Sequence, residues 1–146
     1  MDLTALHPRR VTPVMPVKQK ILLVEDHEDT RELMVLLLKQ LNYDVVTAAS
    51  IAGALVLAAS ADFDLFVLDS MLPDGTGTDL CKHIRERNNS TPILFYSAMA
   101  LERDKAEALL AGAQRYLVKP VDSEVFCRTV TEMLNGTTQS LVSVNQ

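Results

Sequence analysis

The sequence predicts a single α/β domain, in which a doubly wound parallel sheet of five strands is covered by five helices. Short apolar runs alternate strictly with helical patterns through five strand–helix units, which is the pattern of a parallel sheet with helices on both faces. The apolar runs are nearly continuous, as expected of strands that are buried on both sides. A length of 146 residues suffices for one such domain with a sizeable core.

Three strands and two helices are predicted in the first half of the domain. Residues 21–24 form a continuous apolar strand, Ile-Leu-Leu-Val. In the helix that follows, Asp29 is expected to be the N-cap and Glu32 its capping-box partner, because leucines recur at helical spacing from Leu33 to Leu41. The next elements are a strand at 43–48, an Ala-rich helix at 50–60 and a strand at 64–68.

The second half of the domain continues the alternation. A turn at 73–77 leads into a helix at 76–86, followed by a strand at 92–96, a helix at 100–111 and a strand at 114–118. Gly112 is expected to end the helix at 100–111 in the left-handed cap position. Asp122 is expected to cap the last helix, which carries apolar residues from Val125 to Leu134.

Both ends of the chain differ in composition from the domain between them. Residues 1–19 contain three prolines and no sustained period, which predicts a flexible N-terminal leader. Residues 136–146 are mostly polar and small, which predicts a C-terminal tail. The folded domain is therefore expected at residues 20–135.

Composition excludes several classes of protein. The chain is 48% hydrophobic and 23% charged, as in ordinary soluble domains, and its net charge of −5 argues against a nonspecific nucleic-acid binder. It has no CxxC or HxxxH spacing typical of a zinc site. No apolar stretch reaches the roughly 18 residues of a transmembrane helix, and no signal-peptide core is present. Two cysteines, Cys81 and Cys127, without a secretory leader indicate a reducing, cytoplasmic setting.

Polar residues end four of the five predicted strands. The first strand ends in Glu25 and Asp26, the third in Asp69, the fourth in Ser97 and the fifth in Lys119. The carboxyl ends of parallel strands share one edge of the sheet, where ligands bind at the point at which the strand order reverses. In the flavodoxin-like order 2-1-3-4-5, the first and third strands flank that point. The sequence thus predicts a site built from these side chains.

The chemistry of this set favours phosphoryl transfer. Three converging carboxylates repel one another unless a cation lies among them, and an all-oxygen set suits Mg²⁺. Lys119 can neutralise Asp69 or contact a phosphoryl oxygen, and Ser97 offers a hydroxyl donor. An Asp near a metal ion and a Lys can attack phosphorus and form an acyl phosphate.

Each residue also has a simpler interpretation when it is considered alone. Asp69 and Ser97 could cap the loops or helices that follow them. Glu25 and Asp26 could be loop acids before a helix N-terminus, and Lys119 a solvated turn residue. The coincidence of four strand ends that carry the groups one reaction needs favours the common site.

Four stretches of the sequence resemble the CheY-like receiver domain of two-component response regulators. Together they are highly specific and span roughly residues 19–135, although any one alone is a weak signal. They are residues 21–26 (Ile-Leu-Leu-Val-Glu-Asp), 67–73 (Val-Leu-Asp-Ser-Met-Leu-Pro) with Gly77, 95–98 (Phe-Tyr-Ser-Ala) and 112–120 (Gly-Ala-Gln-Arg-Tyr-Leu-Val-Lys-Pro).

The resemblance implies a role for each matching residue. Asp69 would accept a phosphoryl group from a phosphohistidine of a sensor kinase or phosphotransfer protein. The domain would catalyse only the phosphorylation and dephosphorylation of its own aspartate, and would not otherwise be an enzyme. Asp26 and the Met71 carbonyl would bind Mg²⁺ directly, and Glu25 largely through water. Ser97 and Lys119 would contact the phosphoryl group. Tyr116 would be the aromatic residue of the conformational switch, and its rotamer would change together with the position of Ser97. The simpler interpretation of Tyr116 is an ordinary half-buried aromatic residue of a strand.

The resemblance also implies partners. A downstream protein would contact the surface of the fourth helix, fifth strand and fifth helix, without direct binding of nucleic acid or membrane by this domain. Gln114 and Arg115 stand where the family often has acids, which makes the choice of partner harder to infer. Met71 and Met99 are expected near the site, where they would affect water access. The sequence does not identify the signalling pathway or decide whether the domain forms a homodimer. It also does not decide whether the domain stands alone or belongs to a longer regulator.

Three other functions fit parts of this pattern. An Asp-nucleophile phosphatase needs a second Asp where this chain has Met71. A flavin carrier needs a phosphate-binding loop where residues 27–30, His-Glu-Asp-Thr, are acidic. A receiver-like interaction module that is never phosphorylated remains the main alternative.

Overall fold

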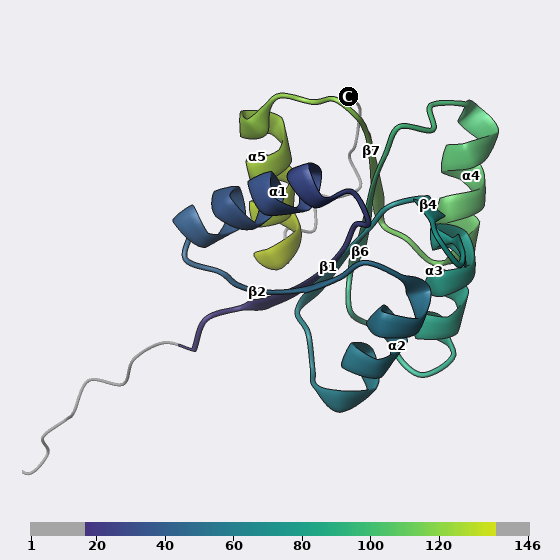
Figure 1. The fold of residues 1–146 in the computed structure, drawn as a ribbon, viewed down its shortest axis with the longest axis horizontal. Coiled ribbons are helices and arrows are strands. Elements are labelled where there is room, and N and C mark those ends of the chain that lie inside the picture. The colour runs from purple at the N-terminus through teal and green to yellow at the C-terminus, as the bar shows by residue number, and fades with distance from the viewer. Residues whose placement is uncertain (1–16, 137–146) are drawn as a thin grey trace, which may run out of the picture.

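The computed structural model describes residues 17–136 as a parallel sheet covered by helices (Figure 1). The sheet has five strands in the order β2-β1-β3-β6-β7, which confirms the predicted order 2-1-3-4-5. The strands are β1 (Lys20–Val24), β2 (Asp44–Ala48), β3 (Leu65–Leu68), β6 (Ile93–Ser97) and β7 (Arg115–Val118). Nearly all of the predicted leader and tail lies outside the described residues.

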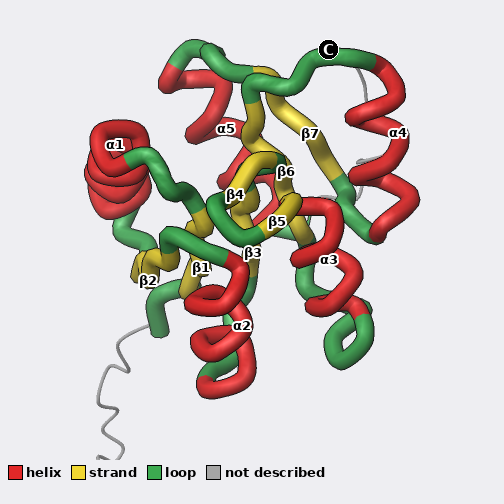
Figure 2. Tube along the Cα trace, turned by 45° about the vertical axis from the view of Figure 1, so that its right-hand side comes forward, coloured by secondary structure: helices red, strands yellow, loops and turns green. Residues whose placement is uncertain are grey.

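Helices cover both faces of the sheet. They are α1 (Glu28–Gln40), α2 (Ile51–Ser60), α3 (Gly77–Arg85), α4 (Glu102–Ala111) and α5 (Ser123–Leu134). Figure 2 shows α1 and α5 on one side of the sheet and α2, α3 and α4 on the other. Within the described residues, no helix is both long enough and apolar enough to cross a membrane.

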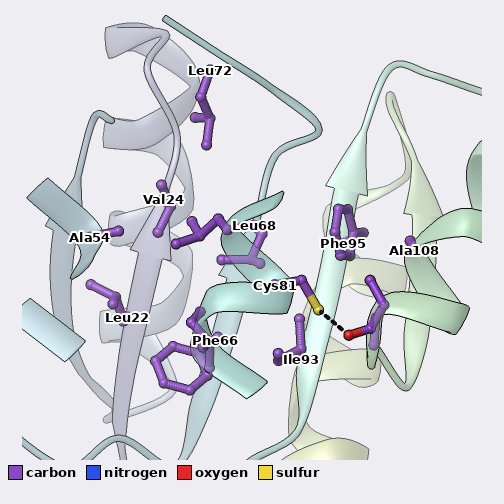
Figure 3. Close-up of a cluster of buried hydrophobic side chains, with 14 of the residues drawn as sticks. Leu22, Val24, Ala54, Phe66, Leu68, Leu72, Cys81, Ile93, Phe95 and Ala108 are labelled. Carbon is purple, nitrogen blue, oxygen red and sulfur yellow. Dashed lines mark hydrogen bonds between the residues drawn. The ribbon is translucent and has the colours of Figure 1, made fainter. Parts of the chain in front are cut away.

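The continuous apolar strands supply two hydrophobic cores, one on each face of the sheet. Successive side chains of a strand point to opposite faces, so Leu22 and Val24 pack toward α2 and α3, whereas Ile21 and Leu23 pack toward α1 and α5. Figure 3 shows the first of these cores, in which the buried Cys81 thiol of α3 donates a hydrogen bond to a backbone carbonyl (3.5 Å). Each fully buried leucine stabilises the fold by about 2 kcal/mol.

The predicted element boundaries agree with the structure to within two residues, but one predicted cap is wrong and a second is confirmed in position only. The helix α1 begins at Glu28 with His27 as its N-cap. Asp29 therefore lies in the first turn, where its negative charge interacts favourably with the helix dipole. Asp122 does occupy the N-cap position of α5, yet its side chain accepts no capping hydrogen bond. Ser50 and Thr76 do cap α2 and α3 through their hydroxyls.

A short hairpin replaces the simple turn predicted after β3. It consists of β4 (Met71–Leu72) paired with β5 (Gly75–Thr76). The Asp74 carboxylate at its tip accepts hydrogen bonds from the N–H groups of Ile51 (2.8 Å) and Ala52 (3.0 Å) at the start of α2. These two hydrogen bonds lower the pKa of Asp74. The hairpin is thereby tied to α2.

Replacing Asp74 with Asn is expected to destabilise the domain at neutral pH but not in strong acid. Because its pKa is lowered in the folded protein, the carboxylate contributes stability above its unfolded pKa of 3.8, and this contribution is lost as the pH falls through the folded pKa. Thermal unfolding at pH 7 and in strong acid, well below the unfolded pKa of 3.8, should show a larger loss of Tm for Asp74→Asn at pH 7. Asp122→Asn, at a cap without a side-chain hydrogen bond, is the matched control. Equal deficits of Asp74→Asn at both pH values would contradict the assignment.

Candidate functional site

A cleft of about 360 Å³ lies at the carboxyl ends of the strands. Six of the seven residues predicted for the site line this cleft: Glu25, Asp26, Asp69, Met71, Ser97 and Lys119. The seventh, Tyr116, lies beside it. Met99 also lines the cleft, as expected from the sequence, and so does Ala98, which follows Ser97. His27 and Thr30 complete the lining, and no sequence signal pointed to them.

The sheet itself brings three carboxylates together. The main chain of Glu25 continues the β1–β2 ladder through its N–H bond to Ala48 (3.0 Å), and Asp69 continues the β3–β1 ladder through its N–H bond to Val24 (3.1 Å). Oxygens of Glu25, Asp26 and Asp69 all lie within 4.8 Å of one another. Glu25 and Asp69 are buried, and Asp26 is exposed. This set of oxygens could hold a metal ion.

The Lys119 ammonium lies between two of these carboxylates. It is 2.8 Å from Glu25 Oε1 and 3.1 Å from Asp69 Oδ2, so it is not a solvated turn residue. Its backbone N–H bonds to the Ser97 carbonyl (2.8 Å), and the following peptide bond to Pro120 is cis. Burial alone lowers the pKa of Lys119, but the hydrogen bond to Glu25 and the charge of Asp69 outweigh that effect and raise it. Lys119 therefore stays charged at neutral pH.

Glu25 is more deeply buried than the sequence suggested. Only 2% of this residue is exposed, and its two carboxylate oxygens accept from Lys119 and from the His27 N–H (3.2 Å). Burial raises the pKa of the Glu25 carboxyl, and the hydrogen bond from Lys119 opposes that rise. One direct role of Glu25 is thus to hold Lys119.

The backbone around Asp69 is held by the start of α3. A Cβ at Gly77 would overlap the Asp69 carbonyl oxygen, so only glycine permits this close approach. The Gly77 N–H also bonds to the Ser70 carbonyl (2.8 Å). The Asp69 side chain accepts a hydrogen bond at Oδ1 from the Ser70 N–H (2.7 Å). Both carboxylate oxygens of Asp69 are therefore oriented.

Ser97 and Tyr116 are joined through the loop before α4. Ser97 is fully buried, and its Oγ accepts from the Met99 N–H (3.0 Å). It does not cap α4, which begins at Glu102. The Tyr116 hydroxyl donates to the Met99 carbonyl (2.7 Å), and its ring stacks on Phe95 with centroids 5.7 Å apart. Tyr116 is half-buried, but its hydroxyl has specific partners.

Sequence reasoning missed Arg31, which supports the site from α1. Its guanidinium donates to the Glu25 carbonyl (2.9 Å) and lies 3.4 Å from the Asp26 carbonyl, so it holds the loop that carries both acids. An arginine in the first turns of a helix is too common a feature to have signalled this role.

Gln114 and Arg115, which stand near the start of β7 in place of the acids expected from the resemblance, have structural roles. The Gln114 side-chain oxygen accepts from the Ile93 N–H (2.7 Å) at the start of β6 and from Arg85 (3.1 Å). Arg115 pairs with Glu132 of α5 at 3.3 Å on a partly exposed surface. Neither residue reaches the cleft.

Comparisons with known proteins agree with this geometry. The family model of the response regulator receiver domain matches residues 21–131. The chain is 39% identical to the response regulator protein PilR of Pseudomonas aeruginosa over 72% of the chain and 24% of PilR. It is 38% identical to the response regulator ArlR of Staphylococcus saprophyticus over 79% of the chain and 52% of ArlR. The chain therefore spans between about a quarter and about half of the length of these relatives.

Solved structures give the same result. A two-component response regulator from Clostridium difficile superimposes with a TM-score of 0.79 and 26% identity, covering 83% of this chain and 99% of that one. The family match covers most of the chain, and the strand order and the acidic cleft agree with it. The chain thus belongs to the receiver domain family of two-component response regulators.

Proposed function

We propose that this domain is a phosphorylation-dependent signalling switch whose phosphoacceptor is Asp69. Membership in the receiver family is consistent with signalling by phosphorylation. The observation that carries the assignment is the position of Asp69, whose carboxylate is buried, bonded to Lys119 and open to a cleft that also holds Glu25 and Asp26. A buried carboxylate needs such partners to stay ionised, and an ionised carboxylate is a nucleophile.

The residues of the cleft fit a magnesium ion. The donors are carboxylate oxygens within 4.8 Å of one another, the ligand type that Mg²⁺ prefers. Asp26, Asp69 and the Met71 carbonyl would bind the ion directly, and Glu25 through water. When bound, the ion supplies positive charge that neutralises the phosphoryl oxygens.

The groups of the chain itself can carry the transfer. One carboxylate oxygen of Asp69 attacks the phosphorus of a phosphohistidine, the P–N bond breaks, and the imidazole leaves with the electron pair of that bond. Lys119, 3.1 Å from Asp69 Oδ2, adds a second positive charge beside the transferred group. Among residues 17–136, Ser97 Oγ accepts from the Met99 N–H and donates to no other group, so its proton can be donated to a phosphoryl oxygen.

The phosphodonor in this proposal is a sensor histidine kinase or a histidine phosphotransfer protein in the cytoplasm. The signal would pass to a downstream protein through the surface of α4, β7 and α5. Exposed apolar side chains on α4, Leu109 and Leu110, support that surface as a contact site. The Tyr116 contact with the loop before α4 would link the cleft to this surface.

Removal of magnesium is expected to abolish phosphorylation. Incubation with acetyl phosphate and Mg²⁺ should add one phosphoryl group by mass, as an acid-stable, base-labile label, and EDTA should prevent it. Asp26→Asn should raise the Mg²⁺ concentration needed for half-maximal labelling by at least about ten-fold, because it removes a charged ligand. Asp29→Asn, an exposed acid of α1 that does not line the cleft, is the matched control. Undiminished labelling in EDTA would refute the metal requirement.

A further inference from the structure

The Tyr116 hydroxyl lies between the loops that follow β3 and β6. It donates its proton to the Met99 carbonyl at 2.7 Å, and the Ser70 Oγ lies 3.4 Å from it. A tyrosine hydroxyl has a single proton, so in this second contact Ser70 is the donor and Tyr116 the acceptor. Because β6 separates β3 from β7 in the sheet, Tyr116 reaches Ser70 across β6, where its ring stacks on Phe95 at an interplanar angle of 4°.

These contacts belong to a continuous chain of hydrogen bonds between the two residues proposed to hold the phosphoryl group. At one end, the Ser70 N–H donates to Asp69 Oδ1 (2.7 Å). At the other end, the Met99 N–H donates to Ser97 Oγ (3.0 Å). Four hydrogen bonds thus run from the Asp69 carboxylate through Ser70, Tyr116 and Met99 to the Ser97 hydroxyl.

Ser70 is the link that makes this chain continuous. Its backbone contacts the carboxylate of Asp69, and its side chain contacts the hydroxyl of Tyr116. Ser70 is buried, and Tyr116 is the one hydrogen-bond partner of its hydroxyl among residues 17–136. A serine that served only to fill space would not need to direct its proton at this acceptor.

We propose that Ser70 is a positioning residue that couples the orientation of Tyr116 to the state of Asp69. This inference rests on the proposed phosphorylation of Asp69. The bond from Ser70 holds the Tyr116 ring against Phe95, and Tyr116 in turn holds Met99 and the oxygen of Ser97, whose proton stays free for a phosphoryl oxygen. The orientation of Tyr116 with its ring stacked on Phe95 therefore favours the phosphorylated form, and by linkage phosphorylation favours that orientation to the same degree.

The orientation of Tyr116 can be followed by fluorine NMR after incorporation of 3-fluorotyrosine. The chain has three tyrosines, so Tyr43→Phe and Tyr96→Phe assign the three signals. Ser70→Ala should move the Tyr116 signal toward that of an exposed tyrosine. It should also raise the acetyl phosphate concentration for half-maximal labelling about three-fold, near the low end for a hydrogen bond because 3.4 Å is long. Ser60→Ala, which removes a hydroxyl bonded to its own helix, should change neither quantity.

A double-mutant cycle separates this role from a general structural one. In a Tyr116→Phe background the acceptor is gone, so Ser70→Ala should have no further effect on labelling. An equal effect in both backgrounds, or a Tyr116 signal unchanged by Ser70→Ala, would overturn the inference. Complete absence of label in the unsubstituted chain would instead overturn the proposed function. In that case, the fluorine signal of Tyr116 in the unphosphorylated protein would still test the contact with Ser70.

Discussion

Replacing Asp69 with Asn is expected to abolish labelling by acetyl phosphate, lowering its rate by at least about three orders of magnitude. An amide oxygen is not a nucleophile toward phosphorus, so the variant lacks the attacking group. Glu25 and Asp26 line the same cleft, so the position of any residual label must be mapped. Mass spectrometry of the intact chain, followed by peptide mapping, measures the result.

The control for this prediction is Asp62→Asn. Asp62 is an exposed acid that lies away from the cleft, so its replacement should leave labelling unchanged. Asp69→Asn should remain folded, because it removes one of three converging carboxylates and leaves Lys119 paired with Glu25. Its thermal unfolding in the absence of Mg²⁺ should therefore occur at the same or a higher temperature. Persistent label on Asp69→Asn would show that the phosphoacceptor is another residue.

Much of this site could be predicted because the carboxyl ends of parallel strands all lie at the same edge of a sheet. Once residues 21–24, 64–68, 92–96 and 114–118 were expected to be parallel strands, the residues after each strand had to share one edge. That argument alone predicted that Asp26, Asp69, Ser97 and Lys119 would lie together, and the cleft contains all four. The strand order needed one further step, the rule that places the site where the order reverses.

Other features depend on contacts that no local pattern contains. The ion pair of Lys119 with Glu25 joins residues far apart in the chain, and its geometry depends on how deeply the end of β1 is buried. Asp74 was expected in a turn, but its role at the start of α2 required knowledge of which helix lies beside the hairpin. Asp29 matched a capping pattern, yet the N-cap of α1 is His27, two residues earlier. Local propensities predict such caps poorly where tertiary contacts, here those of Arg31, hold the preceding loop.

Replacing Lys119 with Met is expected to destabilise the domain by about 3 kcal/mol at neutral pH. The change removes the ammonium group that lies between Glu25 and Asp69 and leaves two buried carboxylates without a cation. Breaking a buried ion pair by removing one partner costs more than the pair contributes, because the remaining charge is still desolvated. Urea unfolding monitored by circular dichroism measures the loss. The control is Lys105→Met, whose partner Glu102 is 91% exposed, and it should change stability by no more than about 0.5 kcal/mol.

The pH dependence of this loss distinguishes an electrostatic cause from a packing defect. Burial already raises the folded-state pKa of Glu25, and without Lys119 that pKa rises further because an opposing hydrogen bond is gone. The folded variant then binds a proton that the unfolded chain releases above about pH 4.5, so its stability falls as the pH rises through that window. The deficit relative to the unsubstituted protein should be largest near pH 7 and small below pH 4.5. The double variant Glu25→Gln with Lys119→Met should recover much of it, because the amide needs no cation, whereas a deficit that is the same at every pH would mean that Lys119 acts through packing alone.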